Sequence, residues 1–188
     1  LKRDLHFQTN TSIDTLDYTG ESVNCGSKVI FSAAGDAIRT LSKELPPLTL
    51  PDDFTNPTVC SPGVIALQGP KFKDHKGAAQ EIAQLGKCLE SQISHQDFPL
   101  IILCDDSKFC AQTLNNFLWM TFTRSNPSHD IYGIQESVKF KHWGCEGPLI
   151  IDARIKPHHA PPLIEDPEVS KNVERFFKAG AVLEKYSS

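Results

Sequence analysis

Residues 100–106 of the chain read LIILCDD, and this stretch does most to decide the fold class. Five consecutive apolar residues followed by acids are typical of a strand that is buried on both faces. Residues 63–67 (GVIAL) and 149–151 (LII) have the same character. Strands covered on both faces occur in sheets that lie between two layers of helices, so the sequence predicts a largely parallel sheet flanked by helices.

Two segments between these strands have apolar residues at helical spacing. These residues are Ile82, Leu85, Leu89 and Ile93 in residues 75–93, and Leu114, Phe117, Leu118 and Phe122 in a segment that begins near Ser107. Asp106 or Ser107 can cap the second segment. The alternation of strands and helices predicts a three-layer α/β fold with right-handed crossovers.

A last helix has the clearest start. Asp166 is a suitable N-cap, Pro167 fits the first helical position, and Gly180 is placed to end the helix. We expect its apolar side to be buried against the domain. The residues of that side are Val169, Val173, Phe176 and Phe177.

The first 58 residues differ from the rest. Residues 45–51 (LPPLTLP) and Asn56-Pro57 form a proline-rich connection, while residues 28–31 predict a strand and residues 36–45 a helix. This part is too small to own a core. We interpret residues 1–58 as an arm, which packs in cis, exchanges between chains or is the tail of a preceding domain, and residues 59–188 as the α/β domain.

Composition narrows the class of protein. Apolar residues make up 39% of the 188 residues, charged residues make up 22%, and the net charge is −4. These values are typical of a soluble globular protein, which we expect to be cytoplasmic, and give no reason to expect a nucleic acid or an anionic membrane as a partner. The one methionine is Met120, in mid-chain. We therefore expect a segment of a longer polypeptide, with catalytic residues lying upstream.

The six cysteines predict free thiols rather than disulfides. They are Cys25, Cys60, Cys88, Cys104, Cys110 and Cys145. No C-x-x-C pair is present, and Cys104 lies inside the apolar run, where a thiol behaves as a small hydrophobic group. One hypothesis for the function is an independent cysteine enzyme with Cys25 or Cys110 as nucleophile.

Asp105 and Asp106 follow a predicted strand, at the sheet edge where open α/β folds bind ligands. Adjacent acids there can hold Mg²⁺, as in a stand-alone receiver-like module. Asp152 and Lys156, at the end of another strand, meet only half of the receiver pattern. The simpler interpretation, which we favour, is that the two acids cap the following helix.

Three other features invite a function but favour a structural role. Residues 24–28 (NCGSK), which end at Lys28, resemble part of a phosphate loop without completing it. His158 and His159 lie in a proline-bounded loop, which indicates an exposed pair. Arg124 and Asp130 bracket the loop at 125–129 and can pair with each other or with the region of Trp119.

An ordered set of motifs resembles the C-terminal domain of the UbiD family of decarboxylases. Residues 118–130 (LWMTFTRSNPSHD) resemble its L-W-x-x-x-T-R-x-x-P-x-x-D signature, residues 101–106 its strand ending in acids, and residues 149–154 (LIIDAR) its strand ending in Asp-Ala. Together these motifs cover about residues 60–178. Residues 13–18 (IDTLDY) and 26–29 (GSKV) resemble a further family element that comes here before the domain, as it would in a protein with two such domains in tandem.

The resemblance implies a parent enzyme that is a reversible, non-oxidative carboxy-lyase of aromatic or α,β-unsaturated acids. It implies prenylated FMN, a divalent metal (Mn or Mg) and K, in ubiquinone or menaquinone biosynthesis. In that family the flavin, the metal and a Glu-Arg-Glu catalytic set belong to the central domain, so we expect no catalytic, cofactor or metal residue here.

The family's C-terminal domain mediates oligomer contacts and closes against the flavin domain. The implied partners are therefore the upstream flavin domain and further copies of the chain, and any peripheral membrane association belongs to the parent. The pocket or interface candidates in this chain are Lys28, Asp105, Asp106, Trp119, Arg124, Asp130 and Asp152.

Overall fold

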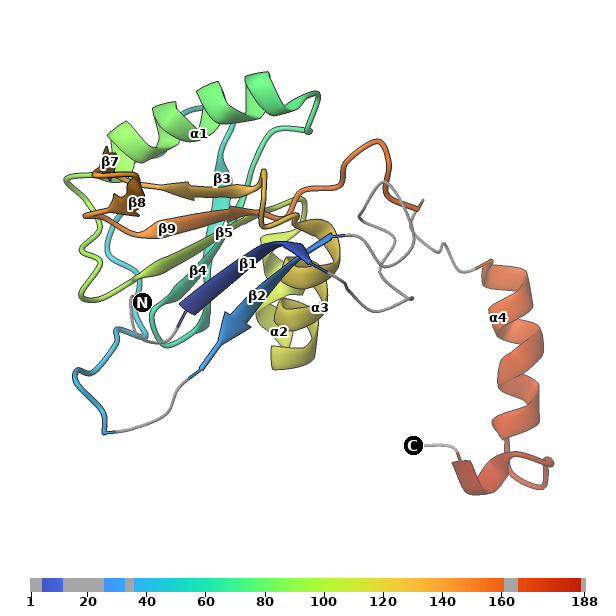
Figure 1. Cartoon of the computed structure of the whole chain (residues 1–188). Coiled ribbons are helices and arrows are strands. Elements are labelled where there is room, and N and C mark those ends of the chain that lie inside the picture. The colour runs from blue at the N-terminus through green and yellow to red at the C-terminus, as the bar shows by residue number, and fades with distance from the viewer. Residues whose placement is uncertain (1–4, 12–25, 33–35, 161–165, 187–188) are drawn as a thin grey trace.

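The computed structural model describes residues 5–11, 26–32, 36–160 and 166–186 (Figure 1). Its centre is a five-stranded sheet in which β4, β5 and β9 are parallel and the two edge strands are antiparallel to their neighbours. In spatial order the strands are β3 (Thr55–Ser61), β4 (Val64–Gln68), β5 (Leu100–Cys104), β9 (Leu149–Asp152) and β6 (Ile131–Gly133). The predicted α/β class, with a largely parallel sheet flanked by helices, is confirmed.

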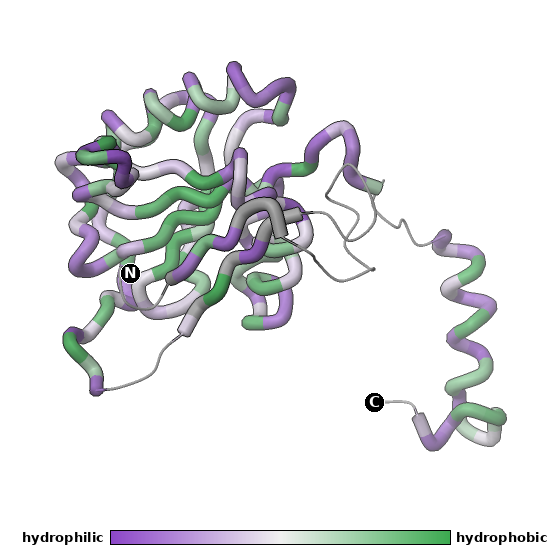
Figure 2. Tube along the Cα trace, viewed as in Figure 1, coloured by the Kyte–Doolittle hydropathy of each residue, from purple (hydrophilic) through white to green (hydrophobic). Residues whose placement is uncertain are grey.

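The strand β5 is buried along its whole length, as its apolar run predicts. Ile101 pairs with Ile65 on one side and with Ile150 on the other. Alternate residues of the strands enter two separate apolar clusters, one on each face of the sheet. Figure 2 shows the apolar residues concentrated along these central strands.

One face of the sheet is covered by α1 (His75–Leu89). The carboxylate of Asp74 caps the helix by accepting a hydrogen bond of 2.8 Å from the backbone N–H of Gly77. The predicted apolar stripe is confirmed, because Ile82, Leu85 and Leu89 are buried in the cluster on this face, together with Ile93 just beyond the helix.

The other face is covered by α2 (Ser107–Gln112) and α3 (Leu114–Arg124), where the sequence predicted one helix. Thr113 adopts an extended backbone that ends α2, and its hydroxyl caps α3. This break changes the phase of the helix, so the predicted stripe is wrong in part: Leu114 is 64% exposed and Leu118 is 42% exposed. The buried residues of α3 are Phe117, Met120 and Thr121.

The arm divides into two parts. The predicted strand is confirmed as β2 (Gly26–Phe31), which pairs with an unpredicted β1 (Leu5–Thr11) in a separate two-stranded sheet. Residues 13–18 and Cys25, to which the sequence analysis gave a role, lie outside the described residues.

The helix predicted over residues 36–45 is wrong. The backbone carbonyl of Ser42 instead accepts a hydrogen bond from Gly63, and its N–H donates to Asp97, so this segment runs along the domain. Leu45, Leu48 and Leu50 pack on the cluster beneath α1, and residue 58 lies within β3. Residues 42–50 thus contact the α/β domain.

The last helix is α4 (Pro167–Glu174), followed by two short 3-10 helices, Arg175–Phe177 and Glu184–Tyr186. The predicted cap is confirmed, because Asp166 accepts a hydrogen bond of 2.8 Å from Glu168 N–H. The predicted buried side is wrong: Val169 is 56% exposed and Val173 is 47% exposed. Figure 1 shows the reason, since α4 stands apart from the sheet and contacts the 3-10 helix that follows it.

A hairpin of β7 (Glu136–Lys139) and β8 (His142–Cys145), which the sequence analysis did not predict, projects where β6 leads into β9. It lies near the C-terminal end of α1 in Figure 1. None of the described helices has the length and apolar character needed to cross a bilayer.

Candidate functional site

The carboxyl edge of the parallel strands gathers most of the charged residues that the sequence singled out. Leu103, near the end of β5, is in register with Asp152 at the end of β9. Residues 105–106 and 152–156 therefore leave the sheet side by side, as expected for parallel strands. Lys28 does not join them, because it lies exposed in β2.

Arg154 is the centre of this edge and is completely buried. Its Nε and Nη2 donate to the two carboxylate oxygens of Asp152 at 2.9 and 2.8 Å, and its Nη1 donates to Glu81 Oε2 at 2.7 Å and to the Pro70 carbonyl at 2.8 Å. Burial alone would lower the pKa of Arg154, but the hydrogen bonds and charges of Asp152 and Glu81 outweigh it and raise the pKa.

Lys156 is the second buried cation. Its Nζ lies 3.2 Å from Asp130 Oδ2 and donates to the carbonyl oxygens of Asp152 at 2.8 Å and Arg124 at 2.9 Å. An ammonium group has three donors, so these contacts use its hydrogen-bonding capacity. The ring of Phe72 faces both cations, with its centroid 5.3 Å from Lys156 Nζ and 5.6 Å from Arg154 Cζ.

Asp130 carries a buried carboxylate oxygen that has no hydrogen-bond partner among the described residues. Its Oδ2 accepts from the backbone N–H of Asn126 at 2.6 Å, but its Oδ1 accepts no hydrogen bond from any residue that the structure describes. Burial raises the pKa of Asp130, and the positive charge of Lys156 opposes that rise. A buried acceptor of this kind can take a donor from solvent or from a neighbouring side chain.

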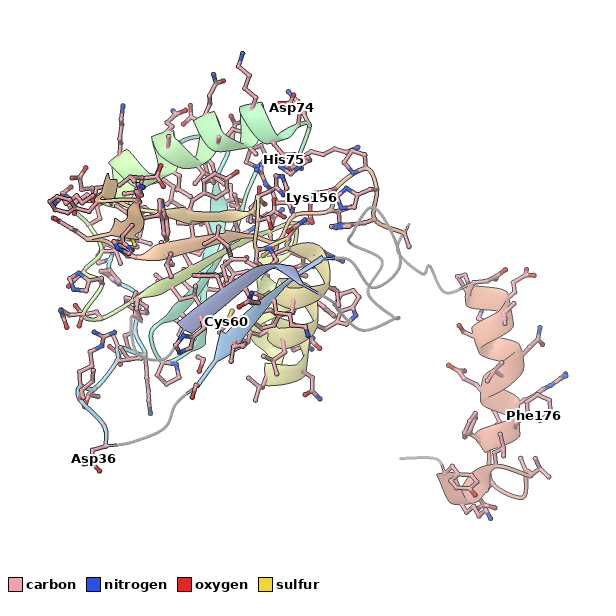
Figure 3. All side chains as sticks on the ribbon, in the orientation of Figure 1. Asp36, Cys60, Asp74, His75, Lys156 and Phe176 are labelled. Atoms are coloured by element: carbon pink, nitrogen blue, oxygen red, sulfur yellow. The ribbon has the colours of Figure 1, made fainter. Side chains whose placement is uncertain are left out.

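His75 is a candidate for this donor. Its Nδ1 lies 3.8 Å from Asp130 Oδ1, and its side chain is 51% exposed. The ring packs against Phe72 at 5.2 Å and His129 at 5.3 Å between centroids. Figure 3 shows His75 and Lys156 close together at this end of the molecule. His75 therefore links the buried charges to solvent and can pair with Asp130 when it is protonated.

Asp105 and Asp106 have different roles. Asp105 Oδ2 accepts a 2.7 Å hydrogen bond from Ile155 N–H and lies 3.4 Å from Arg124 Nη1. Asp106 caps α2 through Phe109 N–H at 2.9 Å, so the capping interpretation is confirmed for this residue. Across the described parts of the chain, no group of three or more His, Cys, Asp or Glu residues could hold a metal ion. The receiver-like alternative is therefore not supported.

Arg124 joins this edge to the outer face of α3. Its guanidinium carbon lies 5.0 Å from the centroid of the exposed Trp119 ring, which in turn packs edge-on against Phe109 at 6.2 Å. Arg124 thus pairs with Asp105 and Trp119. The Arg124–Asp130 alternative is not seen, since Asp130 is engaged by Lys156.

His158 and His159, predicted as an exposed pair, behave differently from each other. His158 is exposed, but His159 is half-buried and its Nδ1 accepts a 3.1 Å hydrogen bond from Lys156 N–H. Burial, with the charges of His158, Lys156 and Arg124, lowers the pKa of His159 to about 4. The ring is therefore neutral near pH 7, as its role as acceptor requires.

Three thiols meet on the opposite side of β4 from α1. Cys60 Sγ lies 3.8 Å from Cys110 Sγ, and Cys104 is beside them at the end of β5. Hydrogen bonds from Cys104 and Cys60 lower the pKa of Cys110 to about 4, and the pKa values of Cys60 and Cys104 are raised by the hydrogen bond to Cys110 and by burial. Cys104 and Cys110 are fully buried, which denies a substrate access to them.

Sequence reasoning missed several members of the carboxyl edge: Phe72, His75, Glu81 and the central role of Arg154. One signal was present, because Asp152, Arg154 and Lys156 alternate and so share one side of an extended chain. The completed arrangement pairs its cations with carboxylates and carbonyls inside the chain. It is suited to fixing the strand ends and the loop at 125–130.

Curated proteins of Chlamydia resemble this chain along most of its length. A protein of Chlamydia pneumoniae, named as a subunit of 4-hydroxybenzoate decarboxylase, is 32% identical in an alignment that covers 94% of this chain and 28% of that protein. Uncharacterized proteins of Chlamydia caviae and Chlamydia muridarum are each 31% identical, covering 84% and 91% of this chain and 25% and 28% of their own lengths. The chain thus spans about a quarter of each relative. No family model matches it.

Proposed function

We propose that this chain is the C-terminal assembly and lid domain of a longer, UbiD-like decarboxylase that removes CO₂ from an aromatic acid of the 4-hydroxybenzoate type. One observation carries the proposal: 94% of the chain aligns, at 32% identity, with a protein named as a 4-hydroxybenzoate decarboxylase subunit. The motif at residues 118–130 is consistent with it, since Arg124 and Asp130 each take part in the carboxyl-edge network.

The chemistry of the carboxyl edge supports a lid rather than a catalyst. Its buried carboxylates, Asp130 and Asp152, are paired with Lys156 and Arg154, so they do not offer a free ligand set for a metal or a flavin phosphate. The carboxyl edge therefore does not fit the prenylated FMN, the Mn or Mg ion or the K ion that the family resemblance implies. We place these groups in the upstream flavin domain of the same polypeptide and assign no catalytic residue to this chain.

The finer parts of the proposal concern the parent protein. We place it in the cytoplasm, in ubiquinone or menaquinone biosynthesis, as a homo-oligomer in which this domain contacts both the flavin domain and other copies. Trp119, exposed on α3 and held by Arg124, is the candidate contact on the side of this domain. An exposed aromatic side chain supported by a stacked arginine is typical of interface residues.

The test is CO₂ release from 4-hydroxybenzoate by the parent polypeptide, loaded with prenylated FMN and metal, beside the 188-residue chain treated in the same way. We expect release by the parent and none by the chain. Trp119→Ala in the parent should lower kcat without changing the thermal stability of this domain, because the side chain is not in the core. Release by the chain alone, or no release by the parent with any aromatic acid tried, contradicts the proposal.

A further inference from the structure

Two thiols from separate elements meet where α2 packs on β3. Cys60 Sγ lies 3.8 Å from Cys110 Sγ, within the distance of an S–H···S hydrogen bond. The sulfur atoms of a disulfide are about 2.05 Å apart, so these two need to approach each other by less than about 2 Å to form one. Both thiols are free in the structure, and Figure 3 labels Cys60 beside α2.

The packing of α2 on β3 brings these sulfurs together. Ser107 and Cys110 are one helical turn apart and are the buried residues of α2. The hydroxyl of Ser107 donates a hydrogen bond to the carbonyl oxygen of Asn56, which lies in β3 with Cys60. Thr113, with an extended backbone, separates α2 from α3. A small shift of α2 toward β3 therefore does not require α3 to move.

Access differs between the two thiols. Cys60 is half-buried and belongs to an edge strand of the sheet, whereas Cys110 is fully buried. A small oxidant from solvent therefore reaches Cys60 first. Cys88 and Cys145 are also half-buried, but each donates a hydrogen bond to a backbone carbonyl oxygen. Cys60 thus combines access from solvent with a neighbouring thiol.

Cys110 has the sulfur that best holds a negative charge. It accepts hydrogen bonds from Cys104 and Cys60 and is attracted by the positive charge of Arg124. These effects outweigh burial and hold the pKa of Cys110 well below the usual value of a thiol. Near neutral pH the pair of Cys60 and Cys110 therefore shares one proton and one negative charge. A thiolate is the nucleophile that disulfide formation requires.

We propose that hydrogen peroxide oxidises Cys60 and Cys110 to a reversible disulfide, which locks α2 onto β3. The two sulfurs are already in contact, one of them is reachable from solvent, and the other is held beside it by the fold. The bond fixes the position of α2, whose Phe109 packs against the exposed Trp119. The inference goes beyond the proposed decarboxylase function and does not depend on it.

The oxidation proceeds in two steps. The shared proton moves to Cys110, and the Cys60 thiolate attacks one peroxide oxygen, so that the O–O bond breaks, hydroxide leaves and Cys60 becomes a sulfenic acid. The hydroxide takes the proton from Cys110, whose thiolate then attacks Cys60 Sγ and releases a second hydroxide. The two sulfurs lose two electrons, which reduce the peroxide to one water and one hydroxide. A small thiol reverses the reaction by exchange.

Peptide mass mapping tests the proposal with the reduced 188-residue chain, treated with hydrogen peroxide at about pH 7 and then alkylated in denaturant. We expect a cross-link between the peptides of Cys60 and Cys110, and loss of the Cys60 thiol at least about tenfold faster than that of Cys88. The cross-link should raise the melting temperature by at least about 4 °C, because it closes a long loop of the unfolded chain. Dithiothreitol should reverse both changes.

Three variants separate the roles of the thiols. In Cys110→Ala, the oxidation of Cys60 should stop at the sulfenic acid, which dimedone traps. In Cys60→Ser, Cys110 should stay reduced, because it is buried and has lost the partner that the oxidant reaches. Cys88→Ser, which removes another half-buried thiol, is the matched control and should form the cross-link at the wild-type rate.

Circular dichroism shows whether each variant is folded, and the wild-type cross-link decides the question even if Cys110→Ala does not fold. No cross-link, a cross-link that joins another pair of cysteines, or a Cys60–Cys110 bond that leaves the melting temperature unchanged would overturn the proposal. The assay involves no flavin or decarboxylase substrate, so its result and that of the decarboxylation test are independent.

Discussion

Lys156 and Arg154 lie in the interior and yet are charged, which is costly unless every donor finds a partner. Their partners are close: Lys156 Nζ is 3.2 Å from Asp130 Oδ2, and Arg154 makes two hydrogen bonds to Asp152. Removing one member of such a pair leaves a buried charge without compensation. The stability of the domain should therefore depend on these side chains far more than on its exposed charges.

Lys156→Met tests this dependence. We expect the free energy of unfolding to fall by about 3–5 kcal/mol, because Asp130 would remain buried without its cation. Lys76→Met, at an exposed position of α1, is the matched control and should change it by less than about 0.5 kcal/mol. Equal effects of the two substitutions in urea denaturation would show that the buried pair contributes nothing.

His159 predicts a pH dependence of stability. Its pKa is lowered from 6.5 to about 4 in the folded chain, so between these values the unfolded chain binds a proton that the folded chain does not. Stability should therefore be lost as the pH falls from 6.5 towards 4. His159 is partly exposed, which limits the loss from this group to about 1 kcal/mol.

The loss at His159 is measured as the difference between about pH 7 and about pH 4.5 in the free energy of unfolding. His159→Asn should reduce this difference, whereas His95→Asn, at an exposed position, should preserve it. If both variants show the wild-type difference, then His159 does not hold the neutral, hydrogen-bonded form that the structure shows.

The cysteines show that an acidic thiol need not be accessible to a reagent. Cys110 has a lowered pKa, which favours the reactive thiolate, but it is fully buried. Under native conditions we expect Cys104 and Cys110 to react with a maleimide at least about tenfold more slowly than the half-buried Cys88, with the sites read by peptide mass. Rapid labelling of Cys110 would instead revive the cysteine-enzyme hypothesis. In denaturant all three should react alike.

At the scale of elements, the two helical layers differ in how firmly the sequence determines their faces. Leu85 of α1 is fully buried against the sheet, whereas Leu114 of α3 is 64% exposed. Leu85→Ala should lower the free energy of unfolding by about 2–5 kcal/mol, and Leu114→Ala by less than about 0.5 kcal/mol. Thermal or urea denaturation measures both, and a large effect at Leu114 would contradict the observed break at Thr113.

These elements also show what periodicity can predict. The stripe of α1 follows from spacing because the helix is continuous, but Thr113 interrupts the next helix and shifts its buried side to Phe117 and Met120. The apolar side of α4 was visible in the sequence, yet spacing says nothing of whether a surface is present to cover it. Asn56 adopts φ 52°, and β3 forms around Pro57 at the edge of the sheet, where a missing N–H is tolerated.

The residues that the candidate site takes from strand ends were predictable from the sequence, whereas those that depend on helix docking were not. Strand ends brought Asp105 and Asp152 to one edge, because parallel register follows from the buried runs. Glu81 and Phe72 come from distant parts of the chain, and their contacts with Arg154 depend on how α1 docks on the sheet. Sequence spacing carries no information on that docking.

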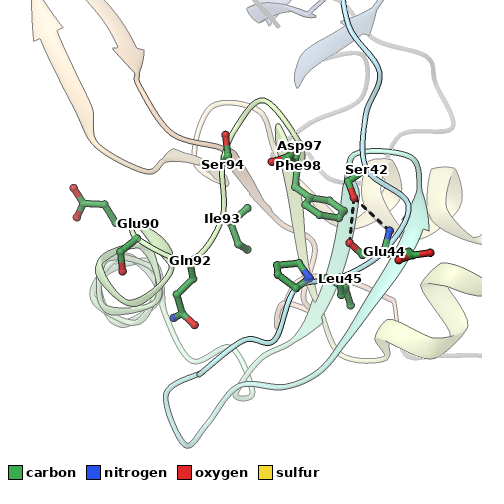
Figure 4. Close-up of a pocket in the computed structure, with 11 residues that line it drawn as sticks. Ser42, Glu44, Leu45, Glu90, Gln92, Ile93, Ser94, Asp97 and Phe98 are labelled. Carbon is green, nitrogen blue, oxygen red and sulfur yellow. Dashed lines mark hydrogen bonds between the residues drawn. The ribbon is translucent and has the colours of Figure 1, made fainter.

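At the scale of the whole molecule, the two edges of the sheet have opposite character. The carboxyl edge is closed by ion pairs around Arg154 and Lys156, while the amino edge carries the exposed hairpin of β7 and β8 and an opening whose charged lining residues are acidic (Figure 4). The α4 helix extends away with its apolar side exposed (Figure 3 labels Phe176 there). A domain whose buried charges are paired and whose surface exposes large apolar side chains is suited to assembly, as the proposed function requires.

The central claim is that the flavin site of the parent protein lies outside this chain, and flavin binding tests it most directly. Prenylated FMN is added to the 188-residue chain and, separately, to the longer parent polypeptide, and retained flavin is measured by absorbance after gel filtration. We expect the parent to retain flavin and the chain alone to retain none. Stoichiometric retention by the chain alone would contradict the account and direct the search for the active site to the carboxyl edge, beginning with Asp130 and His75.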